Sequence, residues 1–177
     1  MTGIAQVYQD ILSRIDNIID SSGNKIFNWR AVFNDQIKRT KDGSGYSFWM
    51  PAVFVEIKTH NEGSIGDQLT YAEMDIIFHI VHNELDDAYG LLDQNTNVFQ
   101  FRDYIKSNFS LFKPTNCGVF IWLGENQSFN HTNIYEYIVK YKCYYIDNLA
   151  SPTITGSEYY NTGASSSFII TYTQSVS

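Results

Sequence analysis

Residues 51–81, "PAVFVEIKTHNEGSIGDQLTYAEMDIIFHIV", decide the fold because they hold two alternating stretches with polar residues between them. From Ala72 to Ile80, apolar side chains recur at every second position, which is the period of a half-buried strand. We therefore expect strands at 52–59 and 68–82. The segment 58–69 between them contains glycine and is predicted to be a wide polar loop, so the two strands should pair as an antiparallel hairpin.

The composition narrows the classes of function. The chain has 177 residues and is 44% hydrophobic, which is enough for one domain with a sizeable core. Its net charge of −7 argues against a surface that grips phosphates. Two cysteines, Cys117 and Cys143, are too few for a zinc site and are expected to be free thiols packed in strands. No apolar run approaches the length of a membrane span and no signal-peptide pattern is present, so we expect a soluble protein of the cytoplasm with no membrane contact.

The alternating period of strands and the i, i+3, i+4 spacing of helices predict the other elements. Apolar residues at helical spacing from Ile4 to Ile19 indicate an amphipathic helix over residues 3–20, with Thr2 as its cap and Gly23 in the left-handed turn that ends it. Further elements are predicted as a strand within 25–33, a helix at 96–109, strands at 117–123 and 133–146, and a polar loop at 124–132. The expected class is α+β, a mainly antiparallel sheet with two helices packed on one face in the order α-β-β-β-α-β-β, over residues 1–149.

The composition changes at residue 150. Residues 150–177 are rich in Ser, Thr and Gly and hold no Lys or Arg, with a β-prone stretch at 167–173. We expect an extended C-terminal arm that adds a strand to a neighbouring molecule. A frayed tail and an edge strand within the same chain remain alternatives.

A search for catalytic patterns finds no phosphate loop, nucleophile elbow or calcium loop. The best metal-binding candidate is the trio Glu73, Asp75 and His79, which would share one face of a strand. The simpler interpretation is the solvent side of a half-buried strand. Glu56 could also face a residue of the next strand and form a carboxylate pair. We expect no catalytic, cofactor-binding or metal-binding residues, no cofactor and no enzymatic activity.

The order of the segments is more informative than any single residue. "PAVFVEIK", "LTYAEMDIIFHIV", "VFQFRDYIKSNF" and "IYEYIVKYKCYYI" follow an N-terminal helix in that order. Over residues 4–147, this layout resembles the tail-terminator and tail-completion proteins of tailed bacteriophages and related head–tail connector subunits. The resemblance implies a structural virion protein that forms a ring of six or twelve copies at the top of the tail. Its partners would be the portal or connector and the tail tube. DNA would pass through the lumen without sequence-specific binding, and assembly would take place in the host cytoplasm.

The predicted subunit interface combines the polar loop with the end of the arm: His60, Asn61, Glu62, Ser64, Ile65, Asp67, Phe168, Ile169, Ile170 and Tyr172. Two other functions stay open. One is a non-viral adaptor that binds partners by strand addition through the arm. The other is a metal-dependent enzyme that uses the face of Glu73, Asp75 and His79.

Overall fold

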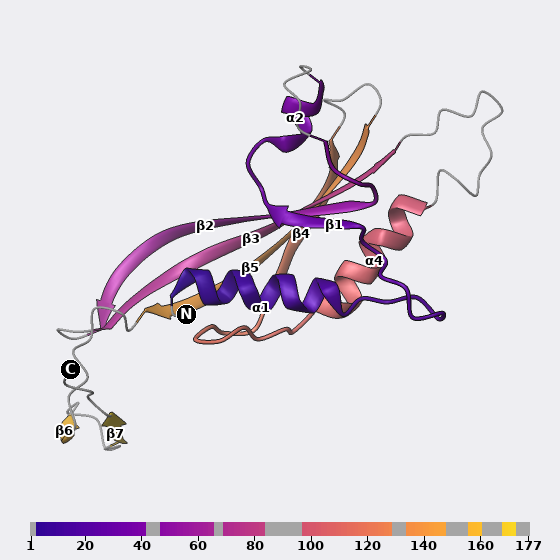
Figure 1. Cartoon of the computed structure of the whole chain (residues 1–177). Coiled ribbons are helices and arrows are strands. Elements are labelled where there is room, and N and C mark those ends of the chain that lie inside the picture. The colour runs from indigo at the N-terminus through magenta and orange to yellow at the C-terminus, as the bar shows by residue number, and fades with distance from the viewer. Residues whose placement is uncertain are drawn as a thin grey trace.

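The computed structural model describes residues 3–41, 47–65, 69–83, 97–128, 134–147, 156–160 and 168–172 (Figure 1). Its elements are α1 (Ile4–Asp16), β1 (Trp29–Val32), α2 (Gln36–Lys41), β2 (Ala52–Ile65), β3 (Leu69–Asn83), α4 (Asn97–Phe109), β4 (Ile121–Ser128), β5 (Ile134–Asp147), β6 (Gly156–Tyr160) and β7 (Phe168–Tyr172). None of the helices in these ranges is long and apolar enough to cross a membrane.

Five strands form one mixed sheet in the order β1-β2-β3-β5-β4. β1 runs parallel to β2, and the other neighbouring pairs are antiparallel. β3 is central and pairs with β5 over its length from Thr70 to Asn83. The predicted α+β class with a mainly antiparallel sheet is therefore confirmed.

The predicted wide loop at 58–69 is wrong over most of its length. β2 continues to Ile65 and β3 begins at Leu69, so the two strands form one long hairpin with a register shift between His60 and Gly63. A strand at a sheet edge can carry polar side chains to solvent, and the polar composition of this stretch therefore resembles a loop. Gly63 lies beneath the ring of Tyr71 on β3, and a Cβ at this position would come within 2.6 Å of the Tyr71 hydroxyl oxygen. A glycine within a strand is thus used here for close cross-strand packing.

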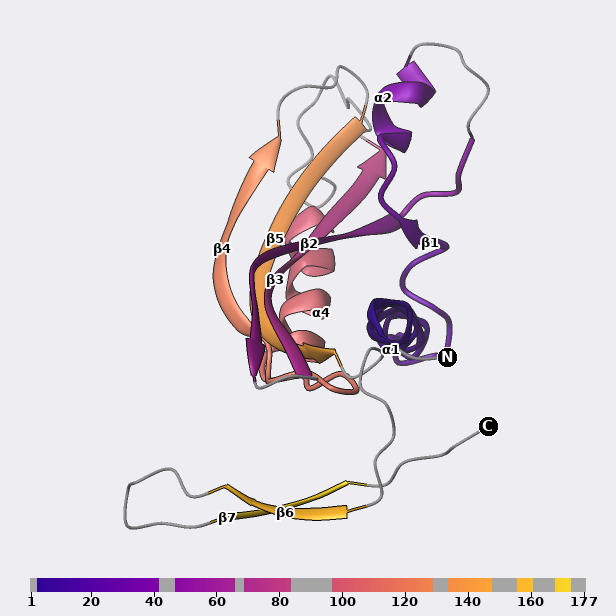
Figure 2. The ribbon, with the colours of Figure 1, turned by 90° about the vertical axis from the view of Figure 1, so that its left-hand side faces the viewer.

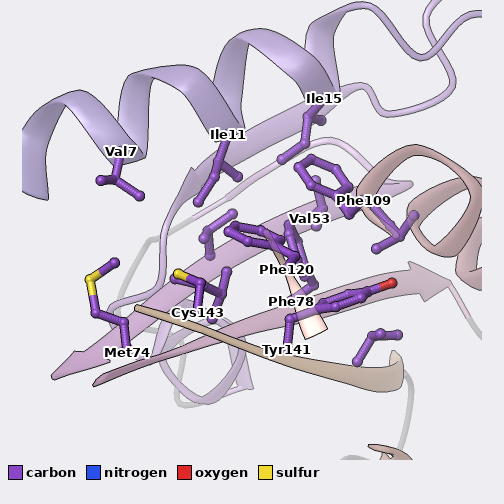
Figure 3. Packing of buried hydrophobic residues seen from close by; sticks show 14 of the residues in the cluster. Val7, Ile11, Ile15, Val53, Met74, Phe78, Phe109, Phe120, Tyr141 and Cys143 are labelled. Atoms are coloured by element: carbon purple, nitrogen blue, oxygen red, sulfur yellow. The ribbon is translucent and has the colours of Figure 1, made fainter. Parts of the chain in front are cut away.

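Helices α1 and α4 cover one face of the sheet, as predicted (Figure 2). The side chains of Val7, Ile11 and Ile15 point from α1 toward the sheet (Figure 3). The alternation predicted from Ala72 to Ile80 is also correct, because Met74, Ile76, Phe78 and Ile80 all lie in this core. The core of this face is aromatic at its centre, because Phe78, Phe109, Phe120 and Tyr141 lie in mutual ring contact.

Both cysteines are buried free thiols, as predicted. Cys143 lies in β5, and Cys117 precedes β4 and makes an isolated bridge to Tyr145. The two thiols hydrogen-bond to each other, and this contact together with burial raises the pKa of Cys143 above its usual value. A raised pKa suits a packed, unreactive thiol.

A second, smaller cluster lies on the opposite face of the sheet. It contains Ile37 of α2, Ala52 and Phe54 of β2, Val81 of β3, and Phe48, which precedes β2. Because both faces of β2 are buried here, its first residues form a continuous apolar run rather than an alternating one. The short helix α2 was not predicted, and the strand expected within 25–33 is limited to Trp29–Val32.

The ends of several elements differ from the predictions. α1 ends at Asp16 rather than at residue 20, because the carboxylate of Asp20 accepts backbone hydrogen bonds from Ser22 and Asn24 and closes a turn. Gly23 has the predicted positive φ, at 84°. Thr2 lies outside the described residues, and Gly3 takes the N-cap position without a side-chain hydrogen bond.

The edge hairpin formed by β4 and β5 is longer than predicted. β4 begins at Ile121 rather than at residue 117 and continues to Ser128, through part of the predicted loop at 124–132. α4 and β5 lie within one residue of their predicted bounds.

The C-terminal residues form a separate two-stranded antiparallel sheet. β6 pairs with β7 from Gly156 opposite Tyr172 to Tyr160 opposite Phe168. β7 falls within the predicted β-prone stretch at 167–173, whereas β6 was not predicted. In the part of the chain that the structure describes, neither strand pairs with the five-stranded sheet.

Candidate subunit interface

The five-stranded sheet has two open edges of different character. β1 covers β2 only from Ala52 to Val55, and the amide of Phe33 extends this cover by donating to the Val55 carbonyl oxygen at 2.9 Å. Within the described ranges, no strand pairs with the outer side of residues 56–65 of β2 or with the outer side of β4. Unpaired backbone groups along a strand edge can bind a further strand.

The β2 edge carries features that hinder strand addition. Lys58 and Glu62 are exposed on it, and the register shift between His60 and Gly63 interrupts its regular backbone. Charged side chains and irregular backbone geometry are common protections of an edge strand.

The start of the β4 edge also has a register shift, between Trp122 and Gly124, but Ile121, Trp122 and Leu123 carry no charge. Ile121, Trp122 and Leu123 are successive large apolar residues, and their exposed fractions are 45%, 47% and 46%. β4 contains no Lys, Arg or Pro. An exposed apolar edge without charge is the kind of surface to which another strand adds.

Apolar side chains of β5 extend this surface onto the helix-free face of the sheet. Tyr144 and Ile146 are about half exposed, at 53% and 46%. Ile121 pairs with Lys142, so Tyr144 is its diagonal neighbour on the same face. We call Ile121, Trp122, Leu123, Tyr144 and Ile146 the β4 edge patch. Trp122 pairs with Tyr141 and lies under Lys106, so it is on the helix-covered face, and the exposed apolar residues occupy both faces of this edge. Exposed apolar residues at an open edge indicate a protein-binding surface.

An ion pair anchors β4 to the helix layer. The guanidinium of Arg102 on α4 donates from Nε to Glu125 Oε2 at 2.8 Å and from Nη2 to Glu125 Oε1. The hydrogen bonds from Arg102 lower the pKa of Glu125, despite an opposing effect of burial. On the same helix, the ammonium of Lys106 lies 4.8 Å from the ring centre of Trp122. Two contacts from α4 thus hold the edge strand in place.

The sequence-predicted interface residues fall into two separate groups. His60, Asn61, Glu62, Ser64 and Ile65 lie on β2 rather than in a loop, and Asp67 lies outside the described residues. Phe168, Ile169, Ile170 and Tyr172 lie on β7. The strand pairing does not bring the two groups together.

Sequence reasoning missed the β4 edge patch. Ile121, Trp122 and Leu123 were included in a predicted strand, but three successive large apolar residues cannot all face one core in a strand of period two. That excess, followed at once by Gly124, was the available signal.

The candidate metal trio lies on one face of β3, as predicted, but its members have different partners. Glu73 binds the ammonium of Lys142 at 3.3 Å, and Asp75 binds His60 Nε2 at 3.1 Å. Among the described residues, no group of three or more metal-ligating side chains is found. The three side chains therefore do not converge on one ion.

His79 is not on a solvent face, which corrects the simpler interpretation of the trio. Its side chain is 8% exposed, and the ring of Phe33 stacks on it at 3.9 Å between centres. Nδ1 lies 2.7 Å from Glu136 Oε1, and Nε2 lies 3.3 Å from Glu56 Oε2. Carboxylates from β2 and β5 thus meet this imidazole, and Glu56 itself lies opposite Ile77 in the strand register.

A hollow of about 380 Å³ lies between α1 and the segment that follows α4. Asp10 accepts the amide of Thr115 there at 2.7 Å, and Arg14 donates to the carbonyl oxygen of Asn108. The amide of Thr115 lowers the pKa of Asp10, although burial opposes this effect. These groups join α1 to the core and are used by the fold itself.

No protein-family model matches the chain, and no curated protein matches it significantly. The resemblance to phage tail proteins thus remains a prediction from the order of the segments.

Proposed function

We propose that this chain is a structural virion protein, one subunit of a ring at the head–tail junction of a tailed phage, where it caps the tail or joins it to the portal. The observation that supports this function best is the five-stranded sheet with two open edges of different chemistry, β2 beyond Val55 and β4.

Unlike edges favour head-to-tail association. When one surface of a subunit binds a different surface of the next, the contact is heterologous, and it closes into a ring if the rotation between subunits fits. A two-fold dimer would instead bring the same edge of both copies together. The long β2–β3 hairpin supplies further surface beyond the short β1 cover, with exposed charges at Lys58 and Glu62.

The charge of the chain supports the same function. A net charge of −7 repels a nucleic acid that passes through a lumen and so prevents it from adhering. The ring would have portal, connector and tail-tube proteins as neighbours, and DNA would only pass through it.

The first test is the mass of the purified chain, measured by native mass spectrometry and by electron microscopy of negatively stained particles. A ring gives one discrete species of six or twelve times the 20.4 kDa chain mass. A monomer at every concentration in a dilution series would contradict the proposal.

The second test shortens the hairpin in register. Replacing residues 61–72 with Asn-Gly closes the hairpin at the His60–Glu73 pair with a two-residue turn. We expect a folded monomer, checked by circular dichroism, that no longer forms rings. Because this change also removes strand partners of β5, a milder variant, Glu62→Arg, reverses an exposed charge of the hairpin and should weaken the ring without altering the fold. Rings at normal yield from both variants would exclude the hairpin as an interface.

The adaptor function retains one supporting observation, the separate β6–β7 sheet. An adaptor would bind other proteins by strand addition while it remained a monomer. The mass measurement distinguishes it from a ring subunit.

A further inference from the structure

We propose that β7 of one copy adds as a strand to the β4 edge of a second copy, so that the C-terminal hairpin links neighbouring subunits. The proposal rests on the ring function above and names the contact that would join its copies.

The acceptor is the start of β4. This strand is the outermost of the sheet, and its first three residues are each nearly half exposed. Trp122 is held by Lys106, and the strand is anchored through Glu125 to Arg102. The edge is therefore already in place before a partner binds, which lowers the entropy cost of association.

The donor is the β6–β7 hairpin. An isolated two-stranded hairpin is at best marginally stable in water, and a third strand supplies the stability that it lacks. β7, "FIITY", consists of aromatic and β-branched residues, which favour strands. The hairpin therefore has both a reason to pair and a suitable sequence.

The charges of the two strands allow the contact. β7 carries no charged residue, and Glu158 is the one charged residue in 150–177. In β4 the one charged residue is Glu125, which is already paired with Arg102. Strand addition thus buries no charge that lacks a partner, a cost that would otherwise oppose binding.

The connection begins five residues after Lys142, which pairs with Ile121 at the start of β4. β5 ends at Asp147, one residue after Ile146 of the β4 edge patch. The eight residues from 148 to 155 can span about 28 Å when extended, which is enough to reach β4 of the same chain. In the single chain, however, β6 and β7 pair with each other and not with β4. This arrangement leaves the hairpin available for β4 of a neighbour.

Disulfide trapping between differently substituted copies tests the contact. Chains with Leu123→Cys are mixed with chains that carry Ile170→Cys or Thr171→Cys, two adjacent positions of β7, so that the test does not depend on which face of a strand meets the acceptor. Under mild oxidation we expect a cross-linked pair of chains in the mixture with at least one of the two, and its loss on reduction. The wild-type chain is the background control, because Cys117 and Cys143 are buried. Thr59→Cys, on the exposed β2 edge, replaces Leu123→Cys as the matched control and should give no cross-link.

Two further variants make the test decisive. Adding Ile121→Lys to the Leu123→Cys chain should reduce its cross-linking to the β7 cysteine about tenfold or more, because an added charge opposes burial. Thr59→Lys should leave it unchanged. A chain with Leu123→Cys and Ile170→Cys together that links mainly to itself would overturn the proposal, as would the absence of any cross-link.

The outcome for the ring is read separately. Rings of discrete mass without a cross-link would overturn the strand addition and leave the ring function intact. A cross-linked product confined to isolated pairs of chains would support the strand addition and contradict the ring.

Discussion

Arg102 of α4 and Glu125 of β4 form a bidentate ion pair that connects the helix layer to the edge strand, with Arg102 Nε 2.8 Å from Glu125 Oε2. The fork of a guanidinium fixes the plane of the carboxylate as well as its position. β4 is the last strand of the sheet and pairs on one side, so this link compensates in part for the absent neighbour.

Glu125→Gln should lower the free energy of unfolding by about 1 kcal/mol, the upper range for a pair that is partly exposed but has good geometry. Urea unfolding followed by circular dichroism measures the change. The side chains of both partners are about a fifth exposed, at 21% and 20%, so solvent weakens the pair but does not cancel it.

The Arg102–Glu125 ion pair also makes the stability of the fold depend on pH. The folded-state pKa of Glu125 is lowered by Arg102, so its contribution is complete above the unfolded-state pKa and is lost as pH falls through the folded-state pKa. The difference between wild type and Glu125→Gln should therefore shrink below about pH 4. Asp103→Asn is the matched control: it also removes a carboxylate from Arg102, but its side chain is 67% exposed and the effect should be near zero. Equal effects from both variants would mean that the anchor is not at Glu125.

Phe78→Ala should destabilise the protein by about 3–5 kcal/mol, the usual cost of removing a fully buried aromatic ring. Phe78 lies at the centre of the core, 4.6 Å from the ring of Phe109 and 5.9 Å from that of Tyr141. Thermal and urea unfolding give the value. Phe99→Ala is the control, because Phe99 is 47% exposed and its ring contacts that of Tyr137 at the surface, so a loss under about 1 kcal/mol is expected. A similar loss at both positions would contradict this account of the core.

The parts of the fold that sequence predicted well are those that bury one face. β3 and α1 each carry an apolar period that matches their geometry, and a shift by one residue would expose the whole apolar set. The prediction of β2 failed beyond Thr59 because the backbone pairs with β3 whatever its side chains are, while a residue such as Glu62 is exposed. The sequence did not predict α2 because its six residues are too few to show a helical period.

The candidate interface was predictable only in part, for a different reason. An open edge is a property of strand order, and the order β1-β2-β3-β5-β4 places β4 outermost although it is not terminal in the sequence. Nothing in residues 121–128 alone reveals which neighbour is absent. The candidate metal trio does not converge for a related reason, which is that its members bind residues of β5 instead. Lys142 pairs with Glu73, and Glu136 contacts His79.

Leu111→Gly should stabilise the protein by about 0.5–1 kcal/mol. Leu111 follows the end of α4 with φ at 61° and is 75% exposed, so its side chain adds backbone strain and little burial. Leu111→Ala is the control, since alanine retains the strain and should give no gain. The midpoint of urea unfolding distinguishes the two, and a gain from alanine would place the effect in the side chain instead.

His79→Leu should cost about 3 kcal/mol or more, because it removes an imidazole that two carboxylates contact inside the protein. The side chain of Glu136 is 7% exposed and lies 2.7 Å from Nδ1, so its carboxylate would lose a close partner in a poorly solvated site.

His60→Leu is the matched control for His79→Leu. Its Nε2 lies 3.1 Å from Asp75, a His–carboxylate pair on the same sheet, but the histidine side chain is 39% exposed and the expected loss is under about 1 kcal/mol. Urea unfolding of both variants at one pH gives the comparison, because burial rather than pairing is what separates the two sites. If His79→Leu were as mild as His60→Leu, the contacts of Glu56 and Glu136 with His79 would be incidental to the stability of the sheet.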